Sequence, residues 1–141
     1  MIDPEALLRG VLAAFEAKDL KRGLSMLAPD AVVIDPHYPQ PVMRGHAAIE
    51  RGMRWAMGTL EKPGFTVRRI WLGGNTVVAE VDASHVIRGP VRQQFTQVFV
   101  AETREGKITH LRSYPPYGPH GTGGVMLRLT RLMWRLRGRL R

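Results

Sequence analysis

Hydrophobic residues recur at helical spacing in two long segments of the first half of the chain. In residues 3–18 and again in residues 45–60, apolar side chains return every three or four positions, which is typical of a helix with one buried face. Asp3 and Pro4 suit the N-cap and the first turn of the earlier helix. The apolar positions are Leu7, Leu8, Val11, Leu12 and Phe15 in the first segment, and Ile49, Met53, Met57 and Leu60 in the second.

A shorter helix and a strand are predicted between these two segments. Residues 18–30 have helical character, with Asp19 placed to cap the helix and Pro29 placed to stop it. Residues 31–35 form a short apolar run with β-branched side chains, which is typical of a buried strand. The proline-rich segment that follows is predicted to be a loop.

From residue 65 onward the pattern changes to runs rich in β-branched and aromatic residues. Short segments containing glycine or asparagine separate these runs, and such residues supply the positive φ that tight hairpins need. Helices followed by an antiparallel meander predict an α+β fold, with three N-terminal helices packed on one face of a curved, mostly antiparallel sheet. The predicted strands cover residues 65–72, 76–88, 91–102 and 107–114.

The last segment of the chain combines an apolar face with a row of arginines. Residues 118–124 are rich in glycine, so we predict a linker there, between a domain at residues 1–117 and a basic amphipathic helix at residues 125–141. Such a helix is typical of a segment that lies on a membrane surface or docks on a partner. The alternative is that its apolar face covers the domain's own sheet or a second copy of the chain. The apolar positions are Met126, Leu129, Leu132, Met133, Leu136 and Leu140, and the basic ones are Arg128, Arg131, Arg135 and Arg139.

The net charge of +9 is concentrated in the same tail. Residues 119–141 hold six arginines and no acidic residue, so residues 1–118 carry only +3. The body of the chain has no tract in which aromatic residues alternate with arginines. A nucleic acid is therefore a disfavoured partner.

Composition excludes several kinds of site in a chain of 141 residues, about the length of one domain. The absence of cysteine excludes disulfides and thiolate metal sites. The histidines are scattered without metal-ligand spacing, and the glycine-rich segment does not join a strand to a helix as nucleotide-binding loops do. We therefore expect no metal and no cofactor. The default location is the cytoplasm, with attachment to the inner face of the membrane through residues 125–141 as the further option.

Asp35 is the first candidate for chemistry, because a carboxylate is costly at the end of an apolar strand. One hypothesis is a general base whose pKa is raised by an apolar cavity and which takes a proton next to a carbonyl. The other is an Asp-Pro turn, in which the carboxylate accepts backbone N–H groups of the loop. His37 and Tyr38 follow, either at the mouth of a pocket or as exposed loop residues.

A second candidate is a strand face that mixes aromatic rings with amides. Gln93, Phe95, Gln97 and Phe99 share one face by strand alternation, a combination typical of a small-molecule pocket. The alternative is an ordinary core strand with glutamines at its ends.

The order of these elements resembles a known family. A strand that ends in Asp-Pro, a helix that starts with "G-x-x-A-I" at Gly45 and a meander that closes on "GKITHLRSY" are similar to the SnoaL-like and ketosteroid-isomerase-like branch of the nuclear-transport-factor-2-like superfamily, over residues 5–115. The resemblance implies a cone-shaped α+β fold, a homodimer formed through the sheet, and an apolar pocket for a small hydrophobic ligand.

The resemblance also implies roles for particular residues. Asp35 falls where ketosteroid isomerases hold their proton-shuttling aspartate, and Gln97 falls where they hold a protonated aspartate that stabilises an oxyanion. The position of their donor tyrosine is occupied by Val11. Asp82 is similar in position to a strand aspartate of limonene epoxide hydrolase, so it joins Asp35 and Gln97 as a catalytic candidate. The residues expected to contact substrate are Phe15, His37, Tyr38, Trp55, Phe95, Phe99 and Ser113.

Two arguments disagree about the direction of Asp82. Alternation along residues 77–86 places Val77, Val81 and His85 on one face, and Asp82 on the other. Hydrophobicity alone sends the apolar face inward, whereas the resemblance sends the polar face into the pocket and leaves the apolar face to a second subunit. We expect the polar face, with Asp82, to line the pocket.

The sequence therefore predicts a SnoaL-like pocket protein. As an enzyme it would be a cofactor-independent isomerase, cyclase or hydrolase, with an aspartate as proton shuttle on a hydrophobic polycyclic or terpenoid-like substrate. The alternative is a non-catalytic ligand-binding or dimerisation module, attached to a membrane through its C-terminal helix.

Overall fold

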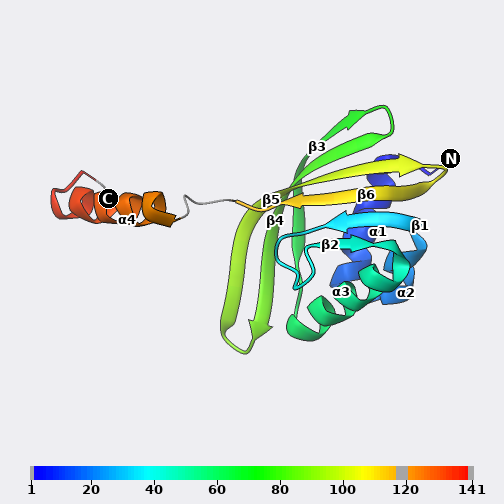
Figure 1. The fold of residues 1–141 in the computed structure, drawn as a ribbon, viewed down its shortest axis with the longest axis horizontal. Coiled ribbons are helices and arrows are strands. Elements are labelled where there is room, and N and C mark those ends of the chain that lie inside the picture. The colour runs from blue at the N-terminus through cyan, green and yellow to red at the C-terminus, as the bar shows by residue number, and fades with distance from the viewer. Residues whose placement is uncertain (1, 117–120, 140–141) are drawn as a thin grey trace.

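A computed structural model describes residues 2–116 and 121–139, which contain four helices and a six-stranded mixed sheet (Figure 1). The strand order is β2-β1-β6-β5-β4-β3, with β1 and β6 parallel and the other neighbours antiparallel. The predicted α+β class is confirmed, and the arrangement is consistent with the cone-shaped fold. The elements are α1 Pro4–Glu16, α2 Leu20–Ser25, β1 Leu27–Ile34, β2 Val42–Arg44, α3 Gly45–Thr59, β3 Phe65–Gly73, β4 Thr76–Arg88, β5 Val91–Arg104, β6 Lys107–Tyr114 and α4 Gly121–Leu136.

The short helix α2 ends earlier than its sequence suggested. Asp19 caps it as expected, since its side chain accepts a hydrogen bond of 3.0 Å from the Arg22 backbone N–H. The helix stops at Ser25, however, and β1 begins at Leu27 and contains Pro29. The register between β1 and β6 shifts between Leu27 and Val32. Pro29 lies in this irregular stretch, where its missing N–H removes no regular ladder bond.

A short edge strand, β2, replaces part of the predicted proline-rich loop. Its three residues pair antiparallel with Val32–Ile34 at the end of β1. Three residues are too few to give a period-two pattern in the sequence. This pairing returns the chain to β1 directly before α3, so the loop that carries Asp35 is held at both ends.

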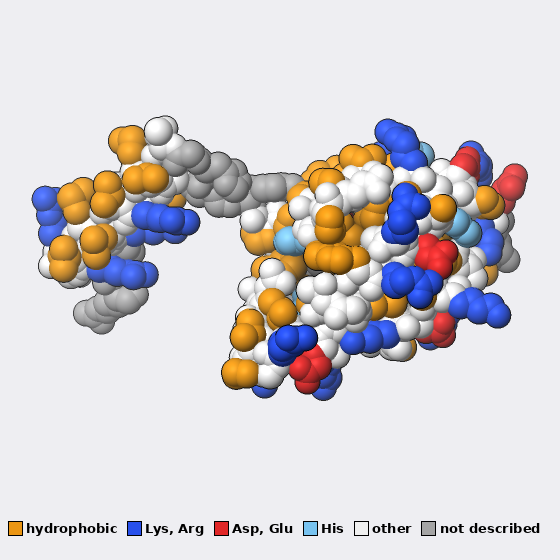
Figure 2. Space-filling view, turned by 60° about the horizontal axis from the view of Figure 1, so that its bottom comes forward, with side chains coloured by type: hydrophobic (Ala, Val, Ile, Leu, Met, Phe, Trp, Pro, Cys, Tyr) orange, Lys and Arg blue, Asp and Glu red, His pale blue; other side chains and the backbone are white. Residues whose placement is uncertain are grey.

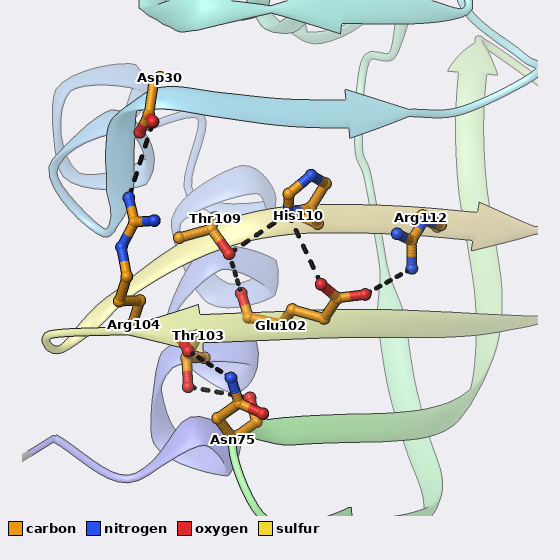
Figure 3. A network of polar contacts seen from close by, with 8 residues as sticks. All are labelled: Asp30, Asn75, Glu102, Thr103, Arg104, Thr109, His110 and Arg112. Carbon is orange, nitrogen blue, oxygen red and sulfur yellow. Dashed lines mark hydrogen bonds and ion pairs between the residues drawn. The ribbon is translucent and has the colours of Figure 1, made fainter.

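The predicted hairpins form where glycine or asparagine was expected to turn the chain. Gly74 opens the β3–β4 turn with a φ of +60°, and Glu105 and Gly106 both have positive φ in the β5–β6 turn, as type I′ geometry requires. Asn75 is bonded to Thr103 of β5 by reciprocal hydrogen bonds of 2.9–3.0 Å, which tie the first turn to the middle of the sheet (Figure 3).

The helices α1 and α3 pack against one face of the sheet, and the core lies between them. The apolar residues of β4 that face this core, Val77, Ala79 and Val81, are fully buried. The expectation that the polar face of β4 would point inward is therefore wrong. The apolar faces of α1 and α3 cover the sheet within a single chain, so burial of Val77, Ala79 and Val81 needs no second subunit.

The opposite face of the sheet carries charged side chains. Figure 3 shows Glu102 between His110 and Arg112, with its Oε1 atom accepting a hydrogen bond of 2.8 Å from the Arg112 guanidinium. Arg104, at the end of β5, lies 3.6 Å from the carboxylate of Asp30. These contacts cross between strands on the outer surface and contribute no group to the interior.

The last helix, α4, begins at Gly121, within the predicted linker, and runs to Leu136. Residues 118–120 of that linker lie outside the described residues, and the division into a domain, a linker and a tail stays a prediction. Figure 1 shows α4 away from the sheet and the other helices. No helix among the described residues is long and apolar enough to cross a membrane.

Candidate functional site

A cavity of about 270 Å³ lies between the helices and the inner face of the sheet. Its walls come from α1, β1, the loop after β1, α3 and the strands β3 to β6, and most of the side chains that line it are apolar. The volume lies near the lower end of the range for small-molecule pockets, about 300 Å³. A ligand of one or two rings therefore fits it more readily than a four-ring one.

Asp35 lines this cavity directly after β1, and its side chain is only 14% exposed. Its Oδ1 atom accepts two hydrogen bonds from His37, one of 2.9 Å from the backbone N–H and one of 3.1 Å from the ring Nδ1. This is the local turn that an Asp-Pro sequence favours. The Oδ2 atom has no hydrogen-bond partner among the described residues. The two hypotheses for Asp35 are therefore compatible in geometry, because the turn occupies one oxygen and leaves the other without a partner among the described residues.

Tyr38 lies in the same loop, and its ring packs against Trp55 of α3 with centroids 5.8 Å apart. Burial raises the pKa of the Tyr38 phenol well above its ordinary value of 10, and the negative charge of Asp35 acts in the same direction. The phenol is therefore neutral and can donate a hydrogen bond throughout the physiological range. Its hydroxyl has no hydrogen-bond partner among residues 2–116 and 121–139.

Gln97 and Ser113 form a buried polar pair on the adjacent strands β5 and β6. The Ser113 hydroxyl donates a hydrogen bond of 2.6 Å to Oε1 of Gln97, and both residues are 4% exposed. Because Ser113 occupies the carbonyl oxygen of the amide, the NH₂ group remains as the free end. Gln97 lines the cavity, so this end is a hydrogen-bond donor available to a ligand.

His85, on the inner face of β4, adds a second nitrogen donor to the cavity lining. The Gly64 backbone N–H donates a hydrogen bond of 3.1 Å to its Nδ1 atom. An Nδ1 atom that accepts cannot carry the ring proton, so the neutral ring bears its proton on Nε2. Burial, and then the nearby His37, lower the pKa of His85, while the carboxylates of Asp35 and Glu16 act in the opposite direction to a smaller extent. The ring is thus held neutral with a fixed tautomer.

Aromatic rings form much of the remaining wall. Phe95 lies 5.0 Å from the ring of His37 and 6.1 Å from that of His85, between the loop and β4. Phe65 makes edge contacts with Phe15, His85 and Phe99 at centroid distances of 5.1–6.2 Å. These rings surround the polar groups with apolar surface, which strengthens any hydrogen bond made inside.

The structure brings together nine of the ten site residues that the sequence suggested. Those that line the cavity are Phe15, Asp35, His37, Tyr38, Trp55, Phe95, Gln97, Phe99 and Ser113. Trp55 is 45% exposed, so it lies at the mouth of the cavity rather than in its interior. Their contributions to binding or chemistry stay predictions.

The tenth residue, Asp82, lies on the outer face of the sheet, and its assignment to the pocket is wrong. Its carboxylate is bonded to the Arg68 guanidinium and accepts a hydrogen bond of 2.8 Å from the Thr96 hydroxyl. The hydrogen bonds from Thr96 and then from Arg68 lower the pKa of Asp82. It is therefore a charged surface residue, separated from the cavity by the thickness of the sheet.

Several cavity residues were missed, above all His85 and Phe65. The missed signal was strand alternation in β4, since the apolar face of residues 77–85 includes His85 and the hydrophobicity argument alone would have placed it inside. Among the described residues, no three histidine, aspartate or glutamate side chains are grouped so that they could hold a metal ion.

Comparisons with known proteins place these findings in a wider context. A family model described as a SnoaL-like domain matches residues 8–111, which include most of α1, every element from α2 to β5 and most of β6. No curated protein matches the chain.

Solved structures show the same fold at low sequence identity. A hypothetical protein with a ketosteroid isomerase-like fold from Catenulispora acidiphila, in complex with trimethylamine, has a TM-score of 0.69 at 20% identity, over 77% of this chain and 83% of that one. An LEH-like epoxide hydrolase from M. tuberculosis has a TM-score of 0.70 at 22% identity, over 96% of each chain. IdmH, a candidate polyketide cyclase from Streptomyces antibioticus, has a TM-score of 0.68 at 20% identity, over 81% and 92%.

Proposed function

We propose, from the premise that the chain belongs to the SnoaL-like family, that this protein is a cofactor-independent isomerase or cyclase. It would move a proton at a carbon next to a carbonyl. Its substrate would be a small hydrophobic molecule of a cyclic or terpenoid-like kind. The observation that carries the proposal is the Asp35 carboxylate, which lines an apolar cavity with one oxygen fixed and the other without a partner among the described residues.

Asp35 would act as the base and later return the proton. The two hydrogen bonds from His37 hold the carboxylate in one orientation, so its Oδ2 atom can approach a substrate carbon without reorganisation. The apolar walls exclude competing water from the site. Positioned proton transfer of this kind contributes about 10²–10⁴-fold to a rate.

The oxygen of the substrate carbonyl gains negative charge when the neighbouring carbon loses its proton. The free amide of Gln97 and the Nε2–H of His85 are neutral donors on adjacent strands, β5 and β4, and both line the cavity. Gln97 would take the role for which ketosteroid isomerases use a protonated aspartate. His85 pairs with Gln93, four positions from Gln97 along β5, so it would donate at a different point of the cavity. One such donor contributes about 3 kcal/mol of transition-state stabilisation.

The alternative is a ligand-binding module without catalysis. One observation favours it: Val11, which occupies the position of the donor tyrosine, lines the cavity and offers no hydrogen bond. In that case Asp35 would orient a ligand that carries its own hydrogen-bond donor.

The two possibilities are separated by hydrogen exchange. We would incubate the protein in D₂O with 2-tetralone, a bicyclic ketone with acidic C–H groups, and follow loss of the α-proton signals by NMR. Asp35→Asn keeps the turn, because the amide oxygen still accepts from His37, but removes the base. We expect at least a 100-fold loss of protein-catalysed exchange. Binding should change little, as measured by tryptophan fluorescence, to which Trp55 at the cavity mouth contributes.

Asp30→Asn is the matched control, because Asp30 lies on β1, the strand that leads to Asp35, with its side chain 75% exposed and outside the cavity lining. Exchange that Asp30→Asn preserves and Asp35→Asn abolishes supports the enzyme. Binding without exchange in the unaltered protein supports the module. Equal exchange by both variants removes Asp35 from the mechanism.

We also propose a homodimer formed through the outer face of the sheet. Trp71 of β3 and Tyr114 of β6 are about half exposed on this part of the molecule, and large exposed aromatic side chains are common at interfaces. Analytical ultracentrifugation should give twice the 15.8 kDa chain mass, and Trp71→Glu should shift it to the monomer. A monomeric unaltered protein would contradict this assignment.

A further inference from the structure

The helix α4 has an apolar face that nothing in the described part of the chain covers. Its large hydrophobic side chains are between 44% and 79% exposed, whereas those of α1 are buried. Figure 2 shows these hydrophobic side chains on the surface of α4, with arginine side chains beside them and no acidic ones. They are Val125, Met126, Leu129, Leu132, Met133 and Leu136 on this face, and Trp134 on the opposite side of the helix.

Helical spacing divides most of α4 into two adjoining faces. At 100° per residue, Val125, Leu129, Leu132 and Leu136 fall within a narrow stripe, widened by Met126 and Met133. The arginines at 128, 131 and 135 fall together beside this stripe. An exposed apolar stripe of this size marks an interaction site rather than a solvated surface.

The positive charge of α4 distinguishes among the partners that could cover its apolar face. Residues 121–139 contain arginines and no acidic residue. Two copies of α4 packed against each other would hold many arginines close together without an acidic residue to pair with them, at an electrostatic cost. A surface with hydrocarbon beneath a layer of negative charge would bury the apolar face of α4 and pair with its arginines at the same time.

We propose that α4 binds the surface of anionic lipid bilayers. The helix has 16 residues, which gives a length of about 24 Å at 1.5 Å per residue. This is shorter than the hydrocarbon core of a bilayer, about 30 Å. The helix therefore lies parallel to the membrane plane, with the leucine stripe at the level of the acyl chains and the arginines at the lipid phosphates. The proposal is independent of the chemistry in the cavity.

Co-sedimentation of the full chain with lipid vesicles tests this proposal. Vesicles of phosphatidylcholine alone are compared with vesicles of phosphatidylcholine and phosphatidylglycerol at a ratio of about 7:3. We expect binding to the anionic vesicles only, weakened when sodium chloride is raised from about 0.1 to 0.5 M, because salt screens the attraction. Each arginine near an anionic surface adds about fivefold to partitioning, so the triple variant Arg128→Gln, Arg131→Gln, Arg135→Gln should bind on the order of 100-fold more weakly.

A matched control removes the same charge from elsewhere. Arg9, Arg51 and Arg54 are exposed helical residues of α1 and α3. Their replacement by glutamine should leave vesicle binding within about twofold of the unaltered protein, since the apolar stripes of these helices are buried in the core. Equal losses in the two triple variants would mean that net charge alone drives binding, and would overturn the assignment to α4.

A second variant tests the apolar face at constant charge. Leu129→Gln, Leu132→Gln and Leu136→Gln together should reduce binding at least 10-fold, because burial of these side chains is lost. The thermal midpoint should stay unchanged, since α4 lies away from the body. Failure of the unaltered chain to bind anionic vesicles would refute the proposal. So would α4-dependent self-association, or retention on duplex DNA, in place of vesicle binding.

Discussion

The Ser113–Gln97 pair predicts an unusual pattern of mutational costs. The Ser113 hydroxyl donates to Oε1 of Gln97 at 2.6 Å, and both side chains are almost fully buried. Ser113→Ala removes the donor and leaves the carbonyl of Gln97 in an apolar wall without a partner. Gln97→Leu does the reverse, and leaves the Ser113 hydroxyl unpaired.

The loss of unfolding free energy in each single variant comes from the buried polar group that the substitution leaves without a partner. A buried polar group without a hydrogen bond costs about 1–3 kcal/mol, whereas removal of both partners is nearly neutral when apolar groups of similar shape replace them. We therefore expect each single variant to lower the free energy of unfolding by about 1–3 kcal/mol. The double variant should cost less than the sum of the singles by at least about 1 kcal/mol.

Urea denaturation followed by circular dichroism measures these free energies, with comparable m-values as the check that the denatured state is unchanged. Ser84→Ala is the matched control, because Ser84 is exposed on the outer face of β4, and it should change stability by less than about 0.5 kcal/mol. Additive costs for the two single variants would refute the reasoning, and with it the claim that Ser113 fixes the amide of Gln97.

Three further predictions follow from the cavity and its rim. The pKa of His85 is lowered in the folded protein, so the unfolded chain binds a proton first as the pH falls below about 6.5, and stability should decrease from that pH downward; His85→Gln should flatten this part of a thermal-melt profile between pH 5 and 8. Tyr38 has a raised pKa, so ultraviolet titration at 295 nm should show one of the three tyrosines ionising well above pH 10, and this late step should vanish in Tyr38→Phe. A Cβ atom at Gly64 would lie 2.6 Å from the backbone oxygen of Ser84, so Gly64→Ala should destabilise the fold by about 1–3 kcal/mol in urea denaturation and disturb the His85 tautomer that the Gly64 N–H sets.

Much of the fold could be predicted from the sequence because local patterns and tertiary burial agree there. The helical stripes around Leu8 and Ile49 became core, and the glycine-containing turns became hairpins. Pro29 misled the prediction, since a proline in a register shift looks the same in sequence as one that stops a helix. The edge strand β2 was missed because its three residues are specified by pairing with β1 and not by a pattern of their own.

The site could be predicted wherever one loop or one strand face sufficed. Asp35, His37 and Tyr38 follow each other in the chain, and alternation along β5 gathers Phe95, Gln97 and Phe99. The predicted placement of Asp82 in the pocket was wrong, because the family resemblance was preferred to the simpler argument that valines and alanines are buried first. The tautomer of His85 depends on a hydrogen bond from the N–H of Gly64, 21 positions away in the chain. No local sequence pattern contains such a contact.

The parallel pairing of β1 with β6 has a consequence for how the molecule is made. The strand that delivers Asp35 joins the sheet only beside β6, which lies more than 70 positions later in the chain. Contacts so distant in sequence form late, because a large loop must close first. During synthesis the three hairpin strands β3 to β5 can assemble early. The first helices and β1 can complete their packing only after residue 114 has left the ribosome. We thus expect ligand-binding competence to arise abruptly, at the moment when β6 docks between β5 and β1.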